Sequence, residues 1–135
     1  MVVLENVSKT FKDKTVLQPM DLKLETGKIT VDQVRDAIRL VGLDPDDKKR
    51  VGKYSLGMRQ RLGIAQAIME NPSLIILDEP MNGLDKEGVE DMRILFAKLR
   101  DEGKTILLAS HAAEDIDILC DSVYELDNGT FHKER

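Results

Sequence analysis

The sequence predicts an α/β fold with a parallel core sheet and a small antiparallel β element at the N-terminus. From Leu56 onward, helical and strand patterns alternate in the order helix, strand, helix, strand, helix, which is typical of an α/β domain. The apolar runs 74–77 and 105–109 are of the continuous kind that a parallel sheet buries on both faces. Residues 2–25 instead alternate apolar and polar side chains around turn-like residues, which favours antiparallel strands.

Composition limits the classes of function. The 135 residues are enough for one domain. The 25 acidic residues outnumber the 20 basic ones, and aromatic residues are scarce, so no nucleic-acid partner is expected. The single cysteine, Cys120, excludes an intramolecular disulfide and indicates a reducing compartment. No signal peptide is visible, and the longest apolar runs are far shorter than a membrane span.

Turns, caps and spacing predict the individual elements. Residues 12–14 and Gln18-Pro19 have turn composition, and a turn at Gly27-Lys28 precedes a new apolar segment that begins at Ile29. Thr30 is expected to cap the first helix in a capping box. The expected helices are 31–41, 56–70 with Ser55 as N-cap, one that follows Asp85 with Val89, Met92, Phe96 and Leu99 as its apolar stripe, and 112–119, and a hairpin is expected over 123–132.

Two adjacent carboxylates, Asp78 and Glu79, follow the first apolar run. Ligands of open α/β sheets bind outside the carboxyl ends of the strands, and two carboxylates are costly to bury together without a cation or a proton. Asp78 is therefore a candidate ligand for Mg²⁺, and Glu79 is a candidate base that activates water for attack on a phosphoryl group. The alternative is a strand followed by a solvated acidic turn.

Three further segments have a functional and a structural interpretation. Ser55 and Gly57 open a helix, whose free N–H groups suit a phosphate, but a serine in this place also predicts an ordinary cap. His111 follows the second apolar run, where it can donate a hydrogen bond to a phosphoryl oxygen, but a lone histidine is more often structural. Asp85 ends the turn 82–85, and its structural interpretation is the N-cap of the next helix.

In order and spacing, these segments resemble the ATP-binding subunit of an ABC transporter, in the subgroup of drug and ABC-2-type exporters. The resemblance covers nearly the whole chain. Leu56 and Met58 replace a glycine and a glutamine of the commonest signature motif, as is usual in that subgroup. The matching motifs are the opening strand 4–11, the signature motif 55–60, Walker B with its catalytic glutamate 74–79, the D-loop 81–85 and the switch histidine His111.

The resemblance implies that the protein binds and hydrolyses ATP with Mg²⁺ as cofactor. Asp78 would hold the Mg²⁺ ion, Glu79 would be the general base, and His111 would steady the γ-phosphate. Phe11 would stack on the adenine ring.

The resemblance also implies partners and a location. In that family two ATP-binding subunits close head to tail over two ATP molecules, so Ser55 and Gly57 would contact the γ-phosphate bound by the second subunit. Asp85 would couple the two sites across this dimer. A transmembrane permease subunit would be the other partner, and the protein would lie at the cytoplasmic, inner face of the cell membrane.

One motif of that family is absent. No Gly-x-x-x-x-Gly-Lys-Ser/Thr loop, which cradles the phosphates, occurs in the sequence. In the family this loop follows the strand expected at Ile29, where Thr30 here leads at once into a helix. Either the loop is deleted and the chain does not hydrolyse ATP, or the sequence omits a segment. We favour omission because a strand that runs directly into a helix leaves no residues to turn, although the capping box of Thr30 and Gln33 counts the other way.

We therefore expect a P-loop-type ABC ATPase domain that is incomplete as the sequence stands. It would be a single domain, 1–135, made of an N-terminal β element (1–30), a remnant of the helical subdomain with the signature helix (31–70), and a catalytic core with a C-terminal hairpin (71–135). Its function would be ATP hydrolysis that powers a membrane transporter. The alternative is a truncated, non-hydrolysing domain that binds partners. An ABC ATPase of DNA repair is disfavoured by the acidic charge and by the lack of sustained heptads.

Overall fold

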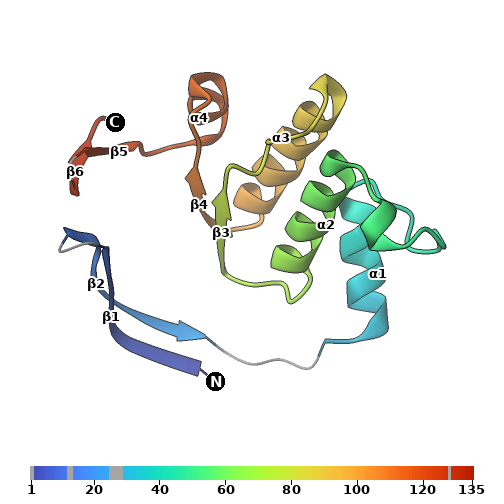
Figure 1. Cartoon of the computed structure of the whole chain (residues 1–135), viewed down its shortest axis with the longest axis horizontal. Helices are drawn as coiled ribbons and strands as arrows, with labels where there is room; N and C mark the ends of the chain where they lie inside the picture. The colour runs from blue at the N-terminus through green and yellow to red at the C-terminus, as the bar shows by residue number, and fades with distance from the viewer. Residues whose placement is uncertain (1, 12–13, 25–28, 128) are drawn as a thin grey trace. The chain divides into compact units, whose positions relative to one another are not determined.

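A computed structural model describes residues 2–11, 14–24, 29–127 and 129–135 of the chain (Figure 1). These residues fall into two compact units, a terminal unit (Met1–Lys28 with Asp121–Arg135) and a central unit (Ile29–Cys120). The elements are β1 (Val2–Phe11), β2 (Lys14–Leu24), α1 (Val31–Leu40), the 3₁₀ turn η1 (Val51–Lys53), α2 (Leu56–Ile68), β3 (Leu74–Asp78), α3 (Lys86–Asp101), β4 (Thr105–Ala109), α4 (Ala113–Leu119), β5 (Tyr124–Asp127) and β6 (Thr130–Lys133).

The terminal unit holds two antiparallel hairpins, β1 with β2 and β5 with β6. The first confirms the predicted N-terminal β element. The turn expected at Gln18-Pro19 is wrong, because β2 continues through both residues. The ladder shifts register there instead, between the pair Val7–Met20 and the pair Lys9–Leu17. A register irregularity of this kind accommodates a proline, which has no N–H to give to the ladder.

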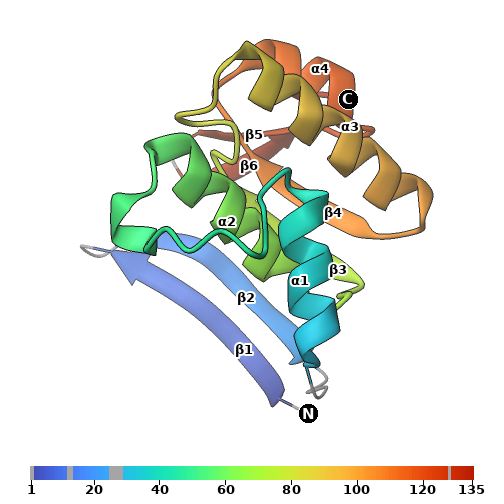
Figure 2. The same ribbon diagram turned by 90° about the vertical axis from the view of Figure 1, so that its right-hand side faces the viewer.

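The central unit is built on the parallel pair β3–β4. Helices α2 and α3 pack against these strands, and α1 lies beside α2 (Figures 1 and 2). This arrangement confirms the predicted α/β class with a parallel sheet. The apolar stripe predicted for α3 is also confirmed, because Met92, Phe96 and Leu99 are buried. The core consists of Ala37, Val41, Ile64, Ala65, Ile68, Ile75, Leu77, Met92, Leu95, Phe96 and Leu99.

The strands of this pair are buried on one face only, so the expectation of burial on both faces is wrong. Ile75 and Leu77 point into the core, whereas Ile76 and Leu107 are 59% and 58% exposed. The helices of the central unit cover one face of the pair, and two strands alone do not make the wider, doubly covered sheet that the apolar runs suggested.

The start of α1 also differs from expectation. No strand is present at Ile29, and the described part of β2 ends at Leu24. The turn expected at Gly27-Lys28 lies outside the described residues. Thr30 and Gln33 form the predicted capping box, in which the Thr30 side chain accepts from the Gln33 N–H at 3.2 Å and the Gln33 side chain accepts from the Thr30 N–H at 2.8 Å. The strand expected at Ile29 is therefore wrong, because Ile29 and Thr30 precede the helix without belonging to a strand.

Candidate active site

The candidate site lies where the two parallel strands end. The last residues of β3 and β4, Asp78 and Ala109, lie opposite each other. Because parallel strands place their carboxyl ends at one edge, Glu79 and His111 come together there from positions far apart in the sequence.

The backbone of Glu79 has an uncommon conformation. Its φ of 47° lies in the left-handed region, which costs a residue with a Cβ about 1–2 kcal/mol and which the following Pro80 further disfavours. Three hydrogen bonds hold it: its N–H donates to the Ala109 carbonyl at 2.9 Å, and its carbonyl accepts from the Asn82 N–H at 3.1 Å and from Gln60 Nε2 at 3.2 Å. Strain that the surroundings maintain in this way is concentrated at functional sites.

The side chain of Glu79 faces His111. The backbone N–H of His111 donates to Glu79 Oε1 at 3.0 Å, and His111 Nε2 lies 3.4 Å from the same oxygen. The Glu79 side chain is 27% exposed, whereas the His111 side chain is 98% exposed. The site thus combines a half-buried carboxylate, fixed by a backbone donor, with an imidazole that is accessible from solvent.

Gln60 is a site residue to which the sequence analysis gave no role. It lies within the signature motif on α2, and its side chain is the contact between that helix and the carbonyl of Glu79. The two residues are 19 positions apart, and no local pattern in the sequence indicates the contact.

The start of α2 packs closely on the D-loop. Ser55 caps the helix, since its hydroxyl accepts from the Met58 N–H at 3.1 Å. A Cβ placed on Gly57 would lie 3.0 Å from the Gly83 carbonyl, and one on Gly83 would lie 2.5 Å from Leu56. Close contact between these two segments therefore explains both glycines, and the proposed phosphate contacts of Ser55 and Gly57 stay predictions.

Asp85 and Asp78 lie near the same turn with different surroundings. Asp85 is the N-cap of α3 and accepts from the Gly88 N–H at 2.9 Å, as its structural interpretation predicts. Asp78 is exposed. Among the residues that the structure describes, no group of three or more His, Cys, Asp or Glu side chains is arranged to hold a metal ion. A single carboxylate still suits Mg²⁺, which proteins bind through one or two carboxylates together with substrate phosphates.

Phe11 is the last residue of β1, where it pairs with Lys14. It belongs to the terminal unit, whereas the other candidate residues belong to the central unit. The side chain of Phe11 lies outside what the structure describes, so its stacking on adenine stays a prediction.

The chain is similar in sequence to ATP-binding proteins of ABC transporters. It is 44% identical over 96 residues to the ABC transporter ATP-binding protein YybJ of Bacillus subtilis, which covers 71% of this chain and 44% of the relative. It is 45% identical over 102 residues to the bacitracin transport ATP-binding protein BcrA of Bacillus licheniformis, which covers 75% of this chain and 33% of the relative. The chain thus spans less than half the length of these relatives.

The fold has a solved counterpart. The dimeric ATP-binding cassette MJ0796, solved in a post-hydrolysis state with ADP and Pi, matches with a TM-score of 0.71 at 21% identity, over 82% of this chain and 50% of that one. Residues 1–82 match a family model that is described as "ABC transporter". Because this match spans more than half of the sequence, the chain belongs to the ABC transporter family.

Proposed function

We propose that this chain is the hydrolytic part of an ABC ATP-binding subunit, which binds ATP with Mg²⁺ and hydrolyses it to power transport across a membrane. The observation that carries the proposal is the contact between Glu79 and His111 at the ends of two parallel strands, together with the left-handed backbone of Glu79. Membership of the ABC transporter family supports the choice of ATP as substrate.

The geometry suits a base and a phosphate donor. The N–H of His111 occupies Glu79 Oε1, and Oε2 has no hydrogen-bond partner among the described residues, so Oε2 would take the proton from the attacking water. The water oxygen would bond to the γ-phosphorus as the bond to the ADP oxygen breaks. The exposed ring of His111 would donate to a γ-phosphate oxygen, and Asp78 would hold the Mg²⁺ ion that neutralises the phosphate charge.

The sequence lacks the motif that cradles the other phosphates in this family. The Gly-x-x-x-x-Gly-Lys-Ser/Thr loop is absent from the sequence, and the start of α2, with Ser55 and Gly57, would serve the γ-phosphate bound by the second subunit instead. We therefore propose that the loop comes from residues that are not among these 135, and that the 135-residue chain alone does not turn over ATP.

The second candidate is a non-hydrolysing domain that binds partners. It is favoured by the start of α1, because the capping box of Thr30 and Gln33 forms. A continuous chain without the loop is therefore compatible with the observed elements.

The partners and the location belong to the same proposal. The chain would form a single domain, 1–135, and a second ATP-binding subunit would close on it head to tail. Ser55 and Gly57 would contact the γ-phosphate bound by that second subunit, and Asp85 would couple the two ATP sites. The dimeric state of the matching cassette supports this. Among the described residues no helix is long and apolar enough to cross a membrane. Membership of the ABC transporter family supports a permease subunit as the other partner, which would hold the protein at the inner face of the cell membrane.

The substitution Glu79→Gln tests the function in the natural gene product, after its intact mass has been compared with the 15.2 kDa of this chain. For a heavier product that holds the loop, we expect ATP binding to persist and turnover to fall by about 10²-fold or more, because the amide cannot accept the proton. The exposed Glu70, which follows α2 away from the site, provides the control Glu70→Gln with normal turnover. Normal turnover in Glu79→Gln would remove Glu79 from the reaction, and a product of 15.2 kDa without ATP binding would favour the second candidate.

A further inference from the structure

Asp115 is the buried charged residue of the central unit. Asp115 lies in the first turn of α4, and its side chain is 4% exposed. Among the described residues, it is the polar or charged residue that is buried. The proposed reaction does not use it. Because burying a carboxylate without a partner is costly, its position requires a structural explanation.

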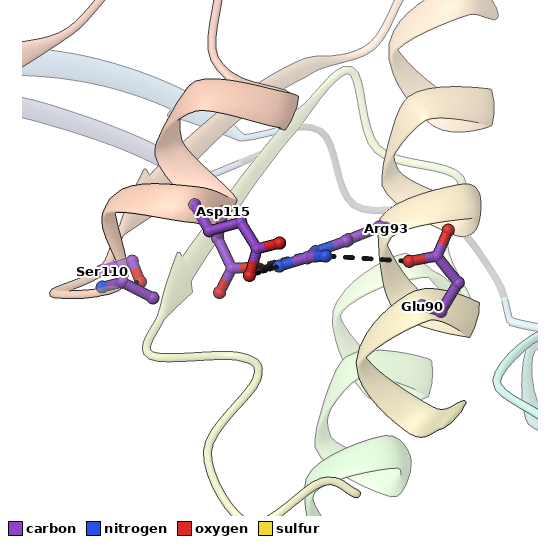
Figure 3. A network of polar contacts seen from close by, with 6 residues as sticks. Glu90, Arg93, Ser110 and Asp115 are labelled. Carbon is purple, nitrogen blue, oxygen red and sulfur yellow. Dashed lines mark hydrogen bonds and ion pairs between the residues drawn. The ribbon is translucent and has the colours of Figure 1, made fainter. Parts of the chain in front are cut away.

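Arg93 of α3 supplies the partner. Its Nη2 and Nε donate to Asp115 Oδ1 at 2.6 and 2.9 Å, and Nη2 also lies 3.1 Å from a carboxylate oxygen of Glu114 (Figure 3). These hydrogen bonds raise the pKa of Arg93, with that of Asp115 the largest cause. Arg93 follows Met92, which is buried in the core, so α3 presents the guanidinium group from a firmly packed position.

The ion pair acts on a short helix. With seven residues and no side-chain cap at Ala112, α4 is too short to be stable by itself in water. Its first turn closes on Ala112, whose carbonyl accepts from the Asp115 and Ile116 N–H groups, and the Ala112 N–H donates to Ser110 Oγ at 3.1 Å. Because these hydrogen bonds connect the first turn of α4 to residues 110–112, an ion pair that fixes Asp115 also fixes that segment.

His111 lies in the middle of this segment, and its N–H reaches Glu79. We propose that the ion pair of Arg93 and Asp115 is a positioning device for the candidate site, which fixes the loop 110–112 so that His111 stays against Glu79. Arg93 contacts neither Glu79 nor His111 in any described interaction and would act through Asp115 and Ala112. The catalytic meaning of this device rests on the proposed function, whereas the positioning itself does not.

Hydrogen exchange of individual amides in the 135-residue chain, followed by NMR, tests the positioning. In Arg93→Ala we expect the His111 amide, which donates to Glu79, to exchange about tenfold faster or more, because its loop opens locally. The amides of Ile76 and Leu77 in β3 should keep their protection. Arg93→Lys should restore part of the protection at His111, since an ammonium group retains the charge but not the forked geometry of a guanidinium group.

Arg100→Ala is the matched control, because Arg100 lies on the same helix and pairs with the exposed Asp101. It should leave the His111 amide unchanged. Unchanged exchange at His111 in Arg93→Ala would overturn the proposal, and so would an equal loss of protection at His111 and in β3, which indicates a merely structural role. If Arg93→Ala does not fold, Arg93→Lys and Asp115→Asn decide by the same comparison. No nucleotide is present in this experiment, so its failure is distinguishable from the failure of the proposed ATPase.

Discussion

Glu79 follows the first parallel strand and has a backbone φ of 47°, which distant residues maintain through hydrogen bonds. Two carboxylates after an apolar strand predicted a functional edge, and the structure brings Glu79 and His111 together there. The left-handed backbone could not be predicted, because the partners that maintain it, Gln60 and Ala109, are distant in the sequence. The roles of Ser55 as cap and Asp85 as cap were accessible, since each depends on residues three positions away.

The strain at Glu79 predicts an unusual order of stabilities. Glycine adopts a positive φ without the steric cost of a Cβ, so Glu79→Gly should have a higher free energy of unfolding than Glu79→Ala, by about 1 kcal/mol. Urea denaturation of the two variants measures the difference. At Glu70, where φ is not positive, the alanine variant should be the more stable. The same order at both positions would show that Glu79 is not strained.

At the scale of elements, periodicity and caps predicted most helices. The stripe of α3 and the capping box of α1 depend on neighbouring residues and were accessible. The burial of β3 could not be predicted from the sequence, because the exposure of Ile76 depends on how many strands and helices surround it. The continuation of β2 through Gln18-Pro19 depends likewise on its pairing with β1.

A side-chain contact between α1 and the loop after it gives a pH-dependent prediction. Arg35 Nη2 lies 2.7 Å from Asp46 Oδ2, and this hydrogen bond, more than the accompanying charge attraction, lowers the pKa of Asp46. A lowered folded-state pKa means that the contact stabilises the fold above the ordinary aspartate pKa, about 3.9. This contribution is lost as the pH falls through the folded-state pKa.

Titration of the Asp46 carboxyl carbon by NMR measures this contribution. In Arg35→Gln the pKa of Asp46 should rise toward its ordinary value. In Arg39→Gln it should rise less, because Arg39 lowers it only through its charge. Equal rises in the two variants, or none, would show that the hydrogen bond to Arg35 does not form in solution.

At the scale of the whole molecule, the motifs predicted the family and the fold class. The family match over residues 1–82 and the structural match at a TM-score of 0.71 confirm both. The reason for the missing phosphate loop could not be predicted from the junction at Thr30, because a helix with a good cap forms there whether or not residues are missing before it. The chain matches 44% and 33% of the length of two similar ATP-binding proteins, which is less than half of each.

On the proposed function, these 135 residues hold the hydrolytic edge of an ABC ATPase without its phosphate loop. Calorimetric titration of the 135-residue chain with ATP and Mg²⁺ tests this proposal, with Glu79→Gln titrated in parallel to exclude heat from hydrolysis. We expect no saturable binding up to about 1 mM ATP in either protein, since without the loop the chain would hold the triphosphate chiefly through a Mg²⁺ ion on one carboxylate, which binds only weakly. Saturable binding of one ATP per chain at micromolar concentration would contradict the claim, because residues other than the missing loop would then hold the phosphates.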